Sequence, residues 1–230
     1  AEVTSYTALT SAATKGTQTL QLKTIPVGWK IGDTVVVAAT VPGAEQNETR
    51  TIIAFVGNAV VLDRPLSYDH VAPADNLDVN VTNLTRNAVI ESESSVVARR
   101  GHVMFMHNRG VAIAYAGFYR LGRTDKSIPI NDSVVNADWT LKPGTGTNPR
   151  GRYSVHFHRN GTVDDGDPAT IIGSAVVDGG GWGYVNHSSY VNMVNNVAFG
   201  VNGAAFATET GNEIGGFYGN LAIGTTGTYE

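Results

Sequence analysis

The sequence predicts an all-β protein: a right-handed parallel β-helix, in which short strands stack as a solenoid of coils, preceded by a small N-terminal β-region. Only 16% of the 230 residues are charged and 27 are glycine, whereas long helices need charged outer faces. From about residue 77 onward, short β-branched runs recur between Gly, Asn and Asp residues. No helical pattern separates these runs, so they cannot form the usual helix-connected parallel sheet. A solenoid of stacked coils, each made of three short strands, is the fold that still agrees with this pattern.

Residues 1–76 are expected to form the N-terminal β-region, and residues 77–230 the coils. The first part contains two short apolar runs, 51–55 and 59–62, which are separated by a Gly-Asn turn. This pattern predicts a β-hairpin. We therefore expect a small barrel or a sandwich-like cap ahead of the solenoid.

The later runs have the length of single solenoid strands. They are 87–90, 103–106, 111–115, 133–135, 154–157, 174–177, 190–194, 203–206 and 220–222. Asn196 and Asn220 lie 24 residues apart, which is about one coil. Asparagines stacked at this spacing predict a hydrogen-bonded ladder, although asparagine is also a common turn residue. The Gly- and Thr-rich segment 141–148 predicts an exposed loop between coils.

Basic residues are concentrated in the centre of an acidic chain. Ten basic and three acidic residues lie between Arg99 and Arg159, whereas the whole chain has a formal charge of −4. A basic centre indicates an anionic ligand. The alternative is that these arginines bind turn carbonyls or the acids of other coils. Because the chain is acidic overall and has no known nucleic-acid-binding motif, nucleic acid is not expected as a partner.

Other chemistry is excluded by what the sequence lacks. The chain has no cysteine, so disulfides and thiol chemistry are excluded. It has no run of about 18 apolar residues, so no membrane-spanning helix is expected. We also expect no organic cofactor.

The segment 154–158 carries the most informative histidines. Alternate residues of a strand share a face, so Val155 and Phe157 are expected to point into the solenoid. His156 and His158 would then stand together on the outside.

Two later segments extend this face. Aligning the segment that ends in His158 with those that end in His187 and Glu209 gives spacings of 29 and 22 residues, each plausible for one coil. The three residues would then stack with about 4.8 Å between rungs. Two histidines and a carboxylate can bind a divalent metal, calcium or zinc. Glu209 as a general acid whose pKa is raised by burial, or a purely structural polar ladder, are the alternatives.

An acidic turn follows the first histidine segment. Asp164, Asp165 and Asp167 resemble a calcium-binding cluster but lack the full EF-hand pattern. A solvated turn is therefore the default interpretation.

Several segments, in order, resemble a known family, the extracellular β-helix proteins related to the CEMIP hyaluronan-degrading proteins and to fibrocystin. The matching segments are 29–33, 61–70, 84–90, 118–123, 152–158, 187, 195–197 and 209–211. The first two resemble the end of the family's eight-glycine domain and the segment after it, and 152–158 resembles its R-Y-P-V-H-F-H motif. Arg123 and Ser154 depart from the pattern, which has Gln and Pro there.

The resemblance implies a parallel β-helix, an extracellular or cell-surface location and action on a glycosaminoglycan-like polysaccharide. For the hyaluronan-degrading members it implies endo-hydrolysis and calcium dependence. Most of the leading eight-glycine domain is missing, so we expect either a fragment of a larger protein, with other domains as partners, or a self-assembling chain whose neighbours cap its coils.

The leading hypothesis is a secreted enzyme that cleaves an anionic polysaccharide, most simply by glycosidic hydrolysis. The expected catalytic residues are His156, His158, His187 and Glu209, and the expected metal ligands are His158, His187 and Glu209. Substrate carboxylates or sulfates would be bound by Arg123, Arg152 and Arg159. Hydrolysis needs a second carboxylate, for which Asp164 and Asp165 are candidates. A lyase is the close variant, and a non-catalytic adhesive or self-assembling surface protein is the alternative from a different class.

Overall fold

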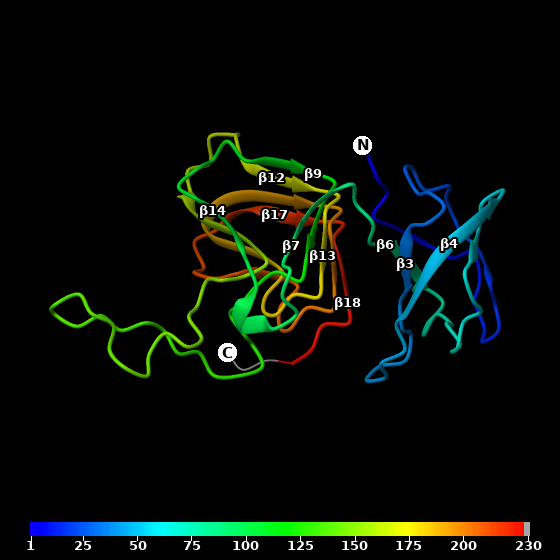
Figure 1. The fold of residues 1–230 in the computed structure, drawn as a ribbon. Coiled ribbons are helices and arrows are strands. Elements are labelled where there is room, and N and C mark those ends of the chain that lie inside the picture. Colours follow the sequence, from blue (N-terminus) through cyan, green and yellow to red (C-terminus); the bar gives the residue numbers. More distant parts are fainter. Residues whose placement is uncertain (228–230) are drawn as a thin grey trace. The chain divides into compact units, whose positions relative to one another are not determined.

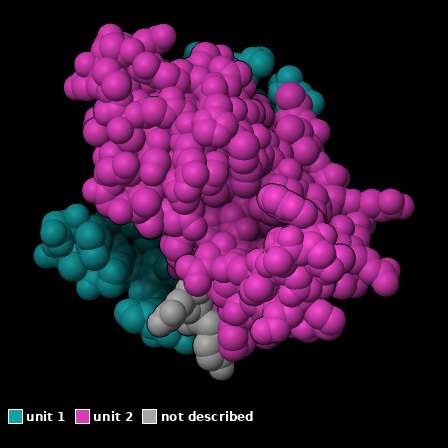
Figure 2. All heavy atoms as spheres, turned by 90° about the vertical axis from the view of Figure 1, so that its left-hand side faces the viewer, with its two compact units in different colours: residues 1–87 teal, residues 88–230 magenta. Residues whose placement is uncertain are grey.

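Strands make up almost all of the regular structure in residues 1–227, which the computed structural model describes (Figure 1). The one helical element in this range is a 3-10 turn, η1 (Val97–Arg99). No helix within it has the length and apolar character needed to span a membrane. The all-β prediction is therefore confirmed. The chain divides into two compact units, Ala1–Asn87 and Ala88–Glu230, which are coloured separately in Figure 2.

The first unit is built on a six-stranded antiparallel sheet. Its spatial order is β1 (Tyr6–Ala8), β6 (Asn80–Asn83), β3 (Thr34–Val37), β4 (Glu48–Val56), β5 (Ala59–Leu62) and β2 (Thr19–Gln21). The predicted hairpin consists of β4 and β5, which pair antiparallel. A bridge between Leu9 and Leu22 joins the ends of the two outer strands, so the sheet curls back on itself as in a small barrel.

The boundary between the units lies at 87/88 rather than at the expected 76/77. The reason is β6, which pairs antiparallel with both β1 and β3. Its hydrogen bonds connect the beginning of the first unit to its central strands. Short polar-apolar alternation is common to both units, so the sequence pattern alone did not assign this strand to the first of them.

A buried polar network ties the first unit together around Glu48. This carboxylate accepts hydrogen bonds from the backbone amides of Ser67 and Tyr68 and contacts Nε2 of His70 at 3.0 Å. It also pairs with the buried Arg50 side chain. Burial by itself would raise the pKa of Glu48, but the hydrogen bonds from His70, Ser67 and Tyr68 outweigh it and lower the pKa to about 2.

The second unit consists of stacked coils whose equivalent strands pair in parallel. One sheet contains β7 (Ala88–Glu91), β10 (Ala116–Tyr119), β13 (Ala175–Val177), β15 (Val197–Phe199) and β18 (Leu221–Ile223). A second series contains β8 (Val103–Met106), β11 (Val155–Gly161), β14 (Tyr184–Val194) and β16 (Phe206–Thr208). The third contains β9 (Ala112–Ala114), β12 (Ala169–Ile172), the second half of β14, and β17 (Ile214–Tyr218). The predicted parallel stacking of short strands is thus confirmed.

The corners of the coils are formed by single residues in the left-handed conformation. Three columns of them, with φ between 47° and 65°, separate the three series of strands: His107, Arg159 and Ser188; Tyr115, Gly173, Asn195 and Gly219; Arg120, Asp178, Gly200 and Gly224. A left-handed residue turns a strand sharply, and for residues other than glycine this conformation is costly. The left-handed conformation recurs at equivalent positions of successive coils, so the stacking of the coils imposes this conformation.

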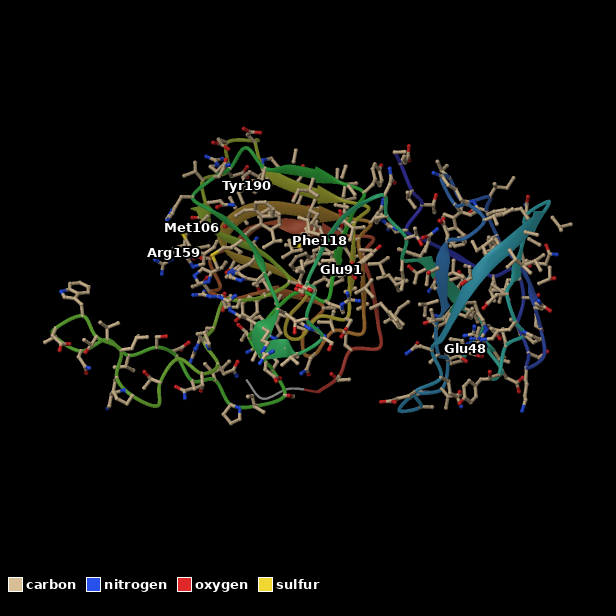
Figure 3. The ribbon with its side chains drawn as sticks, in the orientation of Figure 1. Glu48, Glu91, Met106, Phe118, Arg159 and Tyr190 are labelled. Atoms are coloured by element: carbon tan, nitrogen blue, oxygen red, sulfur yellow. The ribbon has the colours of Figure 1, made fainter. Side chains whose placement is uncertain are left out.

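The interior of the second unit is apolar. Val155 and Phe157 of β11 are fully buried in it, as the strand alternation predicted, together with Tyr184 of β14. Phe118 of β10, labelled in Figure 3, reaches the same core. This core holds β11 and β14 in place, and both strands continue into the candidate site.

The predicted asparagine ladder is present. Nδ2 of Asn196 donates to Oδ1 of Asn220 at 3.0 Å and to the carbonyl of Ile171 at 3.0 Å. Its own Oδ1 accepts from the amide of Ser174 at 2.9 Å. Asn196 is fully buried, so this side chain satisfies two backbone groups that water cannot reach.

A long excursion interrupts the coils between β10 and β11 (Figure 1). Its two arms are joined by isolated bridges between Asn131 and Asn148 and between Val135 and Leu141, and Trp139 is 88% exposed. The loop expected at 141–148 is one arm of this excursion. Its return places residues 150–153 directly before β11.

Candidate functional site

The candidate site lies on three successive coils, in the first parts of β11 and β14 and directly after β16. The parallel register aligns His158 of β11 with His187 of β14. It also aligns Asn186 with Thr208, the last residue of β16, and the amide of Glu209 donates to the carbonyl of Asn186 at 3.1 Å. His158, His187 and Glu209 therefore occupy one column, as their spacing predicted.

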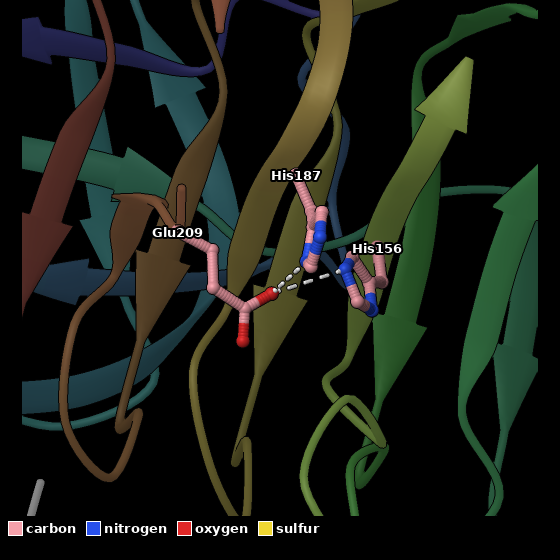
Figure 4. A group of neighbouring side chains, drawn as sticks. All are labelled: His156, His187 and Glu209. Carbon is pink, nitrogen blue, oxygen red and sulfur yellow. Dashed lines mark hydrogen bonds and ion pairs between the residues drawn. The ribbon is translucent and has the colours of Figure 1, made fainter. Parts of the chain in front are cut away.

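The side chains around Glu209 form a compact polar cluster (Figure 4). Nδ1 of His187 lies 2.6 Å from Oε2 of Glu209, and Nε2 of His156 lies 3.5 Å from the same oxygen. The Tyr153 hydroxyl donates to the other oxygen, Oε1, at 2.8 Å. Both carboxylate oxygens of Glu209 thus contact neighbouring side chains, and these side chains come from different coils.

His156 is buried, whereas the strand alternation predicted that it would stand outside. It is 1% exposed because the returning excursion covers it. The Tyr153 ring lies 5.1 Å from its ring, and its Nδ1 lies 3.0 Å from the carbonyl oxygen of Gly151. The outward direction of His156 is therefore compatible with burial, because residues 151–153 form a second layer over the strand.

The atoms that can hold a metal belong to His156, His187 and Glu209. One ligand atom of each lies within 4.8 Å of the other two. The sequence had indicated His158 in place of His156. The His158 ring is close to that of His187, at 4.5 Å between centroids, but contributes no nitrogen to this group. The two histidines share one face of β11, but only His156 has a nitrogen close to the carboxylate.

The electrostatics of Glu209 contradict its expected role as a general acid with a raised pKa. Burial by itself would raise the pKa of Glu209, but interactions with His156 and His187 and the hydrogen bond from Tyr153 lower it to about 2. Glu209 is therefore a carboxylate at neutral pH, suited to be a base, a nucleophile or a ligand. Burial and the charge of Glu209 raise the pKa of Tyr153, so its hydroxyl stays protonated.

Two further histidines next to the cluster are neutral at pH 7. Burial, followed by the charges of His156 and His187, lowers the pKa of His158 to about 4. Burial, followed by the charges of Arg123 and Arg152, lowers the pKa of His102 to about 4. Arg123 and Arg152 thus lie close enough to His102 to influence its charge.

A cavity of about 480 Å³ adjoins the cluster, and Tyr153 and Glu209 form part of its wall. Trp182 also lines it and stacks on Tyr153, with the ring centroids 5.0 Å apart. Lys126 lies over the Trp182 ring at 4.1 Å, and Arg150 completes the basic part of the wall. The cavity thus combines a flat aromatic surface, two cations and the carboxylate.

The sequence patterns did not identify Tyr153 and Trp182 as functional residues. Tyr153 lies in the family-like segment 152–158, and its position close to His156 and His158 is the sequence feature that could have identified it. Trp182 stands alone in a glycine-rich stretch, where a Cβ at Gly181 would lie 2.1 Å from the carbonyl oxygen of Thr124. Such close packing of backbone requires glycine, and a tryptophan in such a stretch indicates a special position.

The three arginines expected to bind substrate have no side-chain partner among residues 1–227. Arg123 and Arg152 are half-buried, and their main chains are joined by a 2.8 Å hydrogen bond. Arg159 is exposed at the corner after His158, and its side chain points away from the coils in Figure 3. The alternative explanation for the basic centre was that its arginines pair with acids of the chain itself. Four of its arginines do form such ion pairs: Arg100 with Asp178, Arg109 with Asp165, Arg120 with Glu91, and Arg150 with Asp132.

The acids proposed as a second carboxylate are engaged elsewhere. Asp165 pairs with Arg109, and Asp164 forms a hydrogen bond with Tyr190. Glu213 is closer to Glu209 in the sequence. It closes the turn after Glu209, because it accepts hydrogen bonds from the amides of Ser188, Glu209, Thr210 and Gly211. Within the described residues, Glu209 is the one carboxylate of the cluster.

No family model matches this sequence. A G8 domain-containing protein of Dictyostelium discoideum is 30% identical over 215 residues, which are 91% of this chain and 16% of that protein. Two further G8 domain-containing proteins of the same organism are 25% and 26% identical over 82% of this chain. The chain thus spans about a sixth or less of these relatives, and its expected resemblance is confirmed at the level of G8 domain-containing proteins.

Three phage tailspike structures overlap with most of the chain. They are gp49 of Pseudomonas phage LKA1, gp61 of Pseudomonas phage phi297, and Gp54 of Acinetobacter baumannii phage AP22 in complex with a capsular saccharide. Sequence identities are 11%, 11% and 12%, and TM-scores are 0.32, 0.31 and 0.30. The overlaps cover 95%, 94% and 95% of this chain and 33%, 47% and 38% of the tailspikes. TM-scores this low do not establish a common overall structure.

Proposed function

We propose that this chain is part of an extracellular enzyme that cleaves an anionic polysaccharide, with its coils wound as a right-handed solenoid. The observation that carries the proposal is the position of Glu209. Its carboxylate, with Tyr153 and two histidines around it, forms part of the wall of a cavity that also contains a tryptophan and cations. Right-handed winding is the general preference of parallel strand crossovers.

The cavity supports recognition of a sugar acid. Trp182 offers a flat apolar face of the kind that lines ligand sites. Lys126 and Arg150 lie beside it, and Arg123 and Arg152 stand near the cluster without acidic partners in the described range. Arginine binds carboxylate or sulfate groups through two parallel hydrogen bonds, so free arginines favour an anionic polymer.

The cluster supports acid–base chemistry at a glycosidic bond. Glu209 is ionised and would act as the base or the nucleophile. A proton donor is also needed, and His187 and the Tyr153 hydroxyl are the groups in contact with Glu209. In the elimination variant, a neutral histidine would remove the proton next to the uronate carboxylate while an arginine neutralises its charge. Both routes cleave the polysaccharide, but only elimination leaves an unsaturated sugar at the new end.

The proposal is tested by incubating the purified chain with hyaluronan, chondroitin sulfate and polygalacturonate, with neutral dextran as control. We expect one anionic polymer to be shortened and dextran to remain intact. New reducing ends without ultraviolet absorbance indicate hydrolysis, and absorbing unsaturated ends indicate elimination. Glu209→Gln and His187→Ala should reduce the rate by at least about 100-fold, whereas Glu45→Gln, an exposed position in the first unit, should not.

Two outcomes contradict the proposal. If the chain binds an anionic polymer but never shortens it, the protein is a non-catalytic surface protein and the enzymatic assignment is wrong. If it neither binds nor shortens any of the polymers, the cavity does not serve an anionic polysaccharide.

A further inference from the structure

We propose that His156, His187 and Glu209 together bind one divalent transition-metal ion of the zinc type. The inference concerns the same site as the proposed function and would name its cofactor, but it is argued from the side chains alone. Three successive coils each contribute one ligand: β11 carries His156, β14 carries His187, and Glu209 follows β16 (Figure 4).

The distances suit a single ion. Zinc binds histidine nitrogen and carboxylate oxygen at about 2.0–2.2 Å, so two ligands of a tetrahedral ion lie about 3.3 Å apart. Oε2 of Glu209 lies 3.5 Å from Nε2 of His156 and 2.6 Å from Nδ1 of His187. These two separations lie on either side of the tetrahedral value, and the three ligand atoms all lie within 4.8 Å of one another.

His156 is oriented as a metal ligand. Its Nδ1 lies 3.0 Å from the carbonyl oxygen of Gly151, which can only accept a hydrogen bond, so Nδ1 carries the proton. In the neutral ring the lone pair is then on Nε2. The histidines of metal sites commonly show this arrangement, in which the nitrogen away from the metal donates to a carbonyl or a carboxylate.

Nε2 of His156 faces the carboxylate of Glu209. Nε2 is buried and has no hydrogen-bond partner, although Oε2 of Glu209 lies 3.5 Å away. A buried polar atom without a hydrogen-bond partner is rare. A cation between Nε2 and Oε2 supplies that partner, because each atom then donates a lone pair to the metal.

Tyr153 holds the carboxylate in a suitable orientation. Its hydroxyl donates to Oε1 at 2.8 Å, which leaves Oε2 free to face the two histidines. Hydrogen-bonded neighbours of this kind orient metal ligands in known sites. Because Tyr153 and Glu209 also line the cavity, the site is placed beside the space that would hold a ligand.

The ligand types select the metal class. Two nitrogens and one oxygen suit zinc and similar transition metals, whereas calcium takes six to eight oxygens. The site is therefore not a calcium site, and calcium should not compete for it. Three protein ligands are also the number found in catalytic zinc sites, where the fourth position is taken by water or substrate.

The test measures metal binding directly, without an activity assay. The tag-free chain is stripped with a chelator and titrated with Zn²⁺ and with Co²⁺ by calorimetry, and the Co²⁺ complex is followed by its visible absorption. We expect one ion per chain and no competition from Ca²⁺. His156→Ala, His187→Ala and Glu209→Gln should each weaken metal binding by more than about 100-fold. Loss of a group that only hydrogen-bonds a metal ligand costs up to about 100-fold, and loss of the ligand itself should cost more.

His158→Ala is the matched control, because His158 lies in the same strand as His156 but outside the ligand group. It should bind the metal like the wild type. Thermal unfolding of each variant without metal shows whether it is folded, and Glu209→Gln keeps the shape of the side chain if an alanine variant is not. Absence of stoichiometric binding in the folded wild type, or a loss in His158→Ala as large as in His156→Ala, overturns the assignment.

The outcomes also separate this inference from the proposed function. Stoichiometric metal without any polysaccharide cleavage supports the metal centre and contradicts the enzyme. Cleavage by a folded wild-type chain that binds no stoichiometric metal supports the enzyme and contradicts the metal centre.

Discussion

Nδ1 of His187 lies 2.6 Å from Oε2 of Glu209, although the two residues are 22 positions apart in the chain. The same relationship, at 24 positions, joins Asn196 to Asn220. In both cases one turn of the coil brings the partner back to the same column. The chemistry of the second unit is therefore assembled along columns, and a substitution should act mainly on its neighbours in adjacent coils.

Tyr153→Phe should weaken Zn²⁺ binding by about 10–100-fold, the usual effect of losing a group that hydrogen-bonds a metal ligand. The ring would still stack on Trp182, so the chain should remain folded. Calorimetric titration measures the effect. Tyr184→Phe is the matched control, because its hydroxyl donates to the carbonyl of Val197 in the core, away from the ligands. Equal Zn²⁺ affinities in the two variants would contradict the role of Tyr153.

Arg152→Ala should reduce the affinity for an anionic polysaccharide by about 10-fold, the loss of about 1.4 kcal/mol that one charged hydrogen bond contributes. Binding by the wild type should weaken as salt rises, and binding by the variant should weaken less. Affinity is measured by titration at two salt concentrations. Arg64→Ala, at an exposed position in the first unit, is the control. If both variants bind like the wild type, Arg152 does not contact the polymer.

Asn196→Ala should lower the free energy of unfolding by about 2–6 kcal/mol. The change leaves the amide of Ser174 and the carbonyl of Ile171 without their partners in a buried site, at about 1–3 kcal/mol each. Chemical denaturation measures the loss. Asn212→Ala, at an exposed position, should change stability by less than about 0.5 kcal/mol. A similar small effect of both substitutions would show that the ladder is not stabilising.

Glu48 should make stability depend on pH at the acid end. Its pKa is lowered from 4.5 to about 2 in the folded chain, so the folded state favours the carboxylate. The resulting stabilisation, about 3 kcal/mol, is complete above pH 4.5 and is lost as the pH falls toward 2. Denaturation at pH 7 and pH 3 should therefore show a larger acid-induced loss in the wild type than in Glu48→Gln.

The matched control for this measurement is Glu45→Gln, which replaces an exposed acid of the same unit. It should keep the pH dependence of the wild type. If Glu48→Gln also keeps it, the buried network around Glu48 does not stabilise the fold through the charge of this carboxylate.

Part of the site was readable from the sequence because a strand has a period of two and a coil has a nearly constant length. Period two placed Val155 and Phe157 in the core. Coil length aligned His158 with His187 and placed Glu209 above them. These are repeats within the chain, and they do not depend on how loops pack.

The identity of the metal-binding histidine could not be read in the same way. His156 and His158 are equivalent in the strand pattern, since both point outward. The choice between them is made by residues 151–153, which return from the excursion, cover His156 and hold its Nδ1. Where a long loop packs depends on contacts between residues far apart in sequence, which periodicity does not encode.

By itself, then, the sequence determined that the chain is all-β, that its second part stacks in parallel coils, and that His187 and Glu209 share a column. The tertiary structure alone decided the burial of His156, the place of Tyr153 and Trp182 beside Glu209, and the assignment of β6 to the first unit. The physical reason is that strand and coil periods are local, repeated properties of the chain. The cavity and its polar cluster instead depend on side chains from different coils meeting under one returning loop.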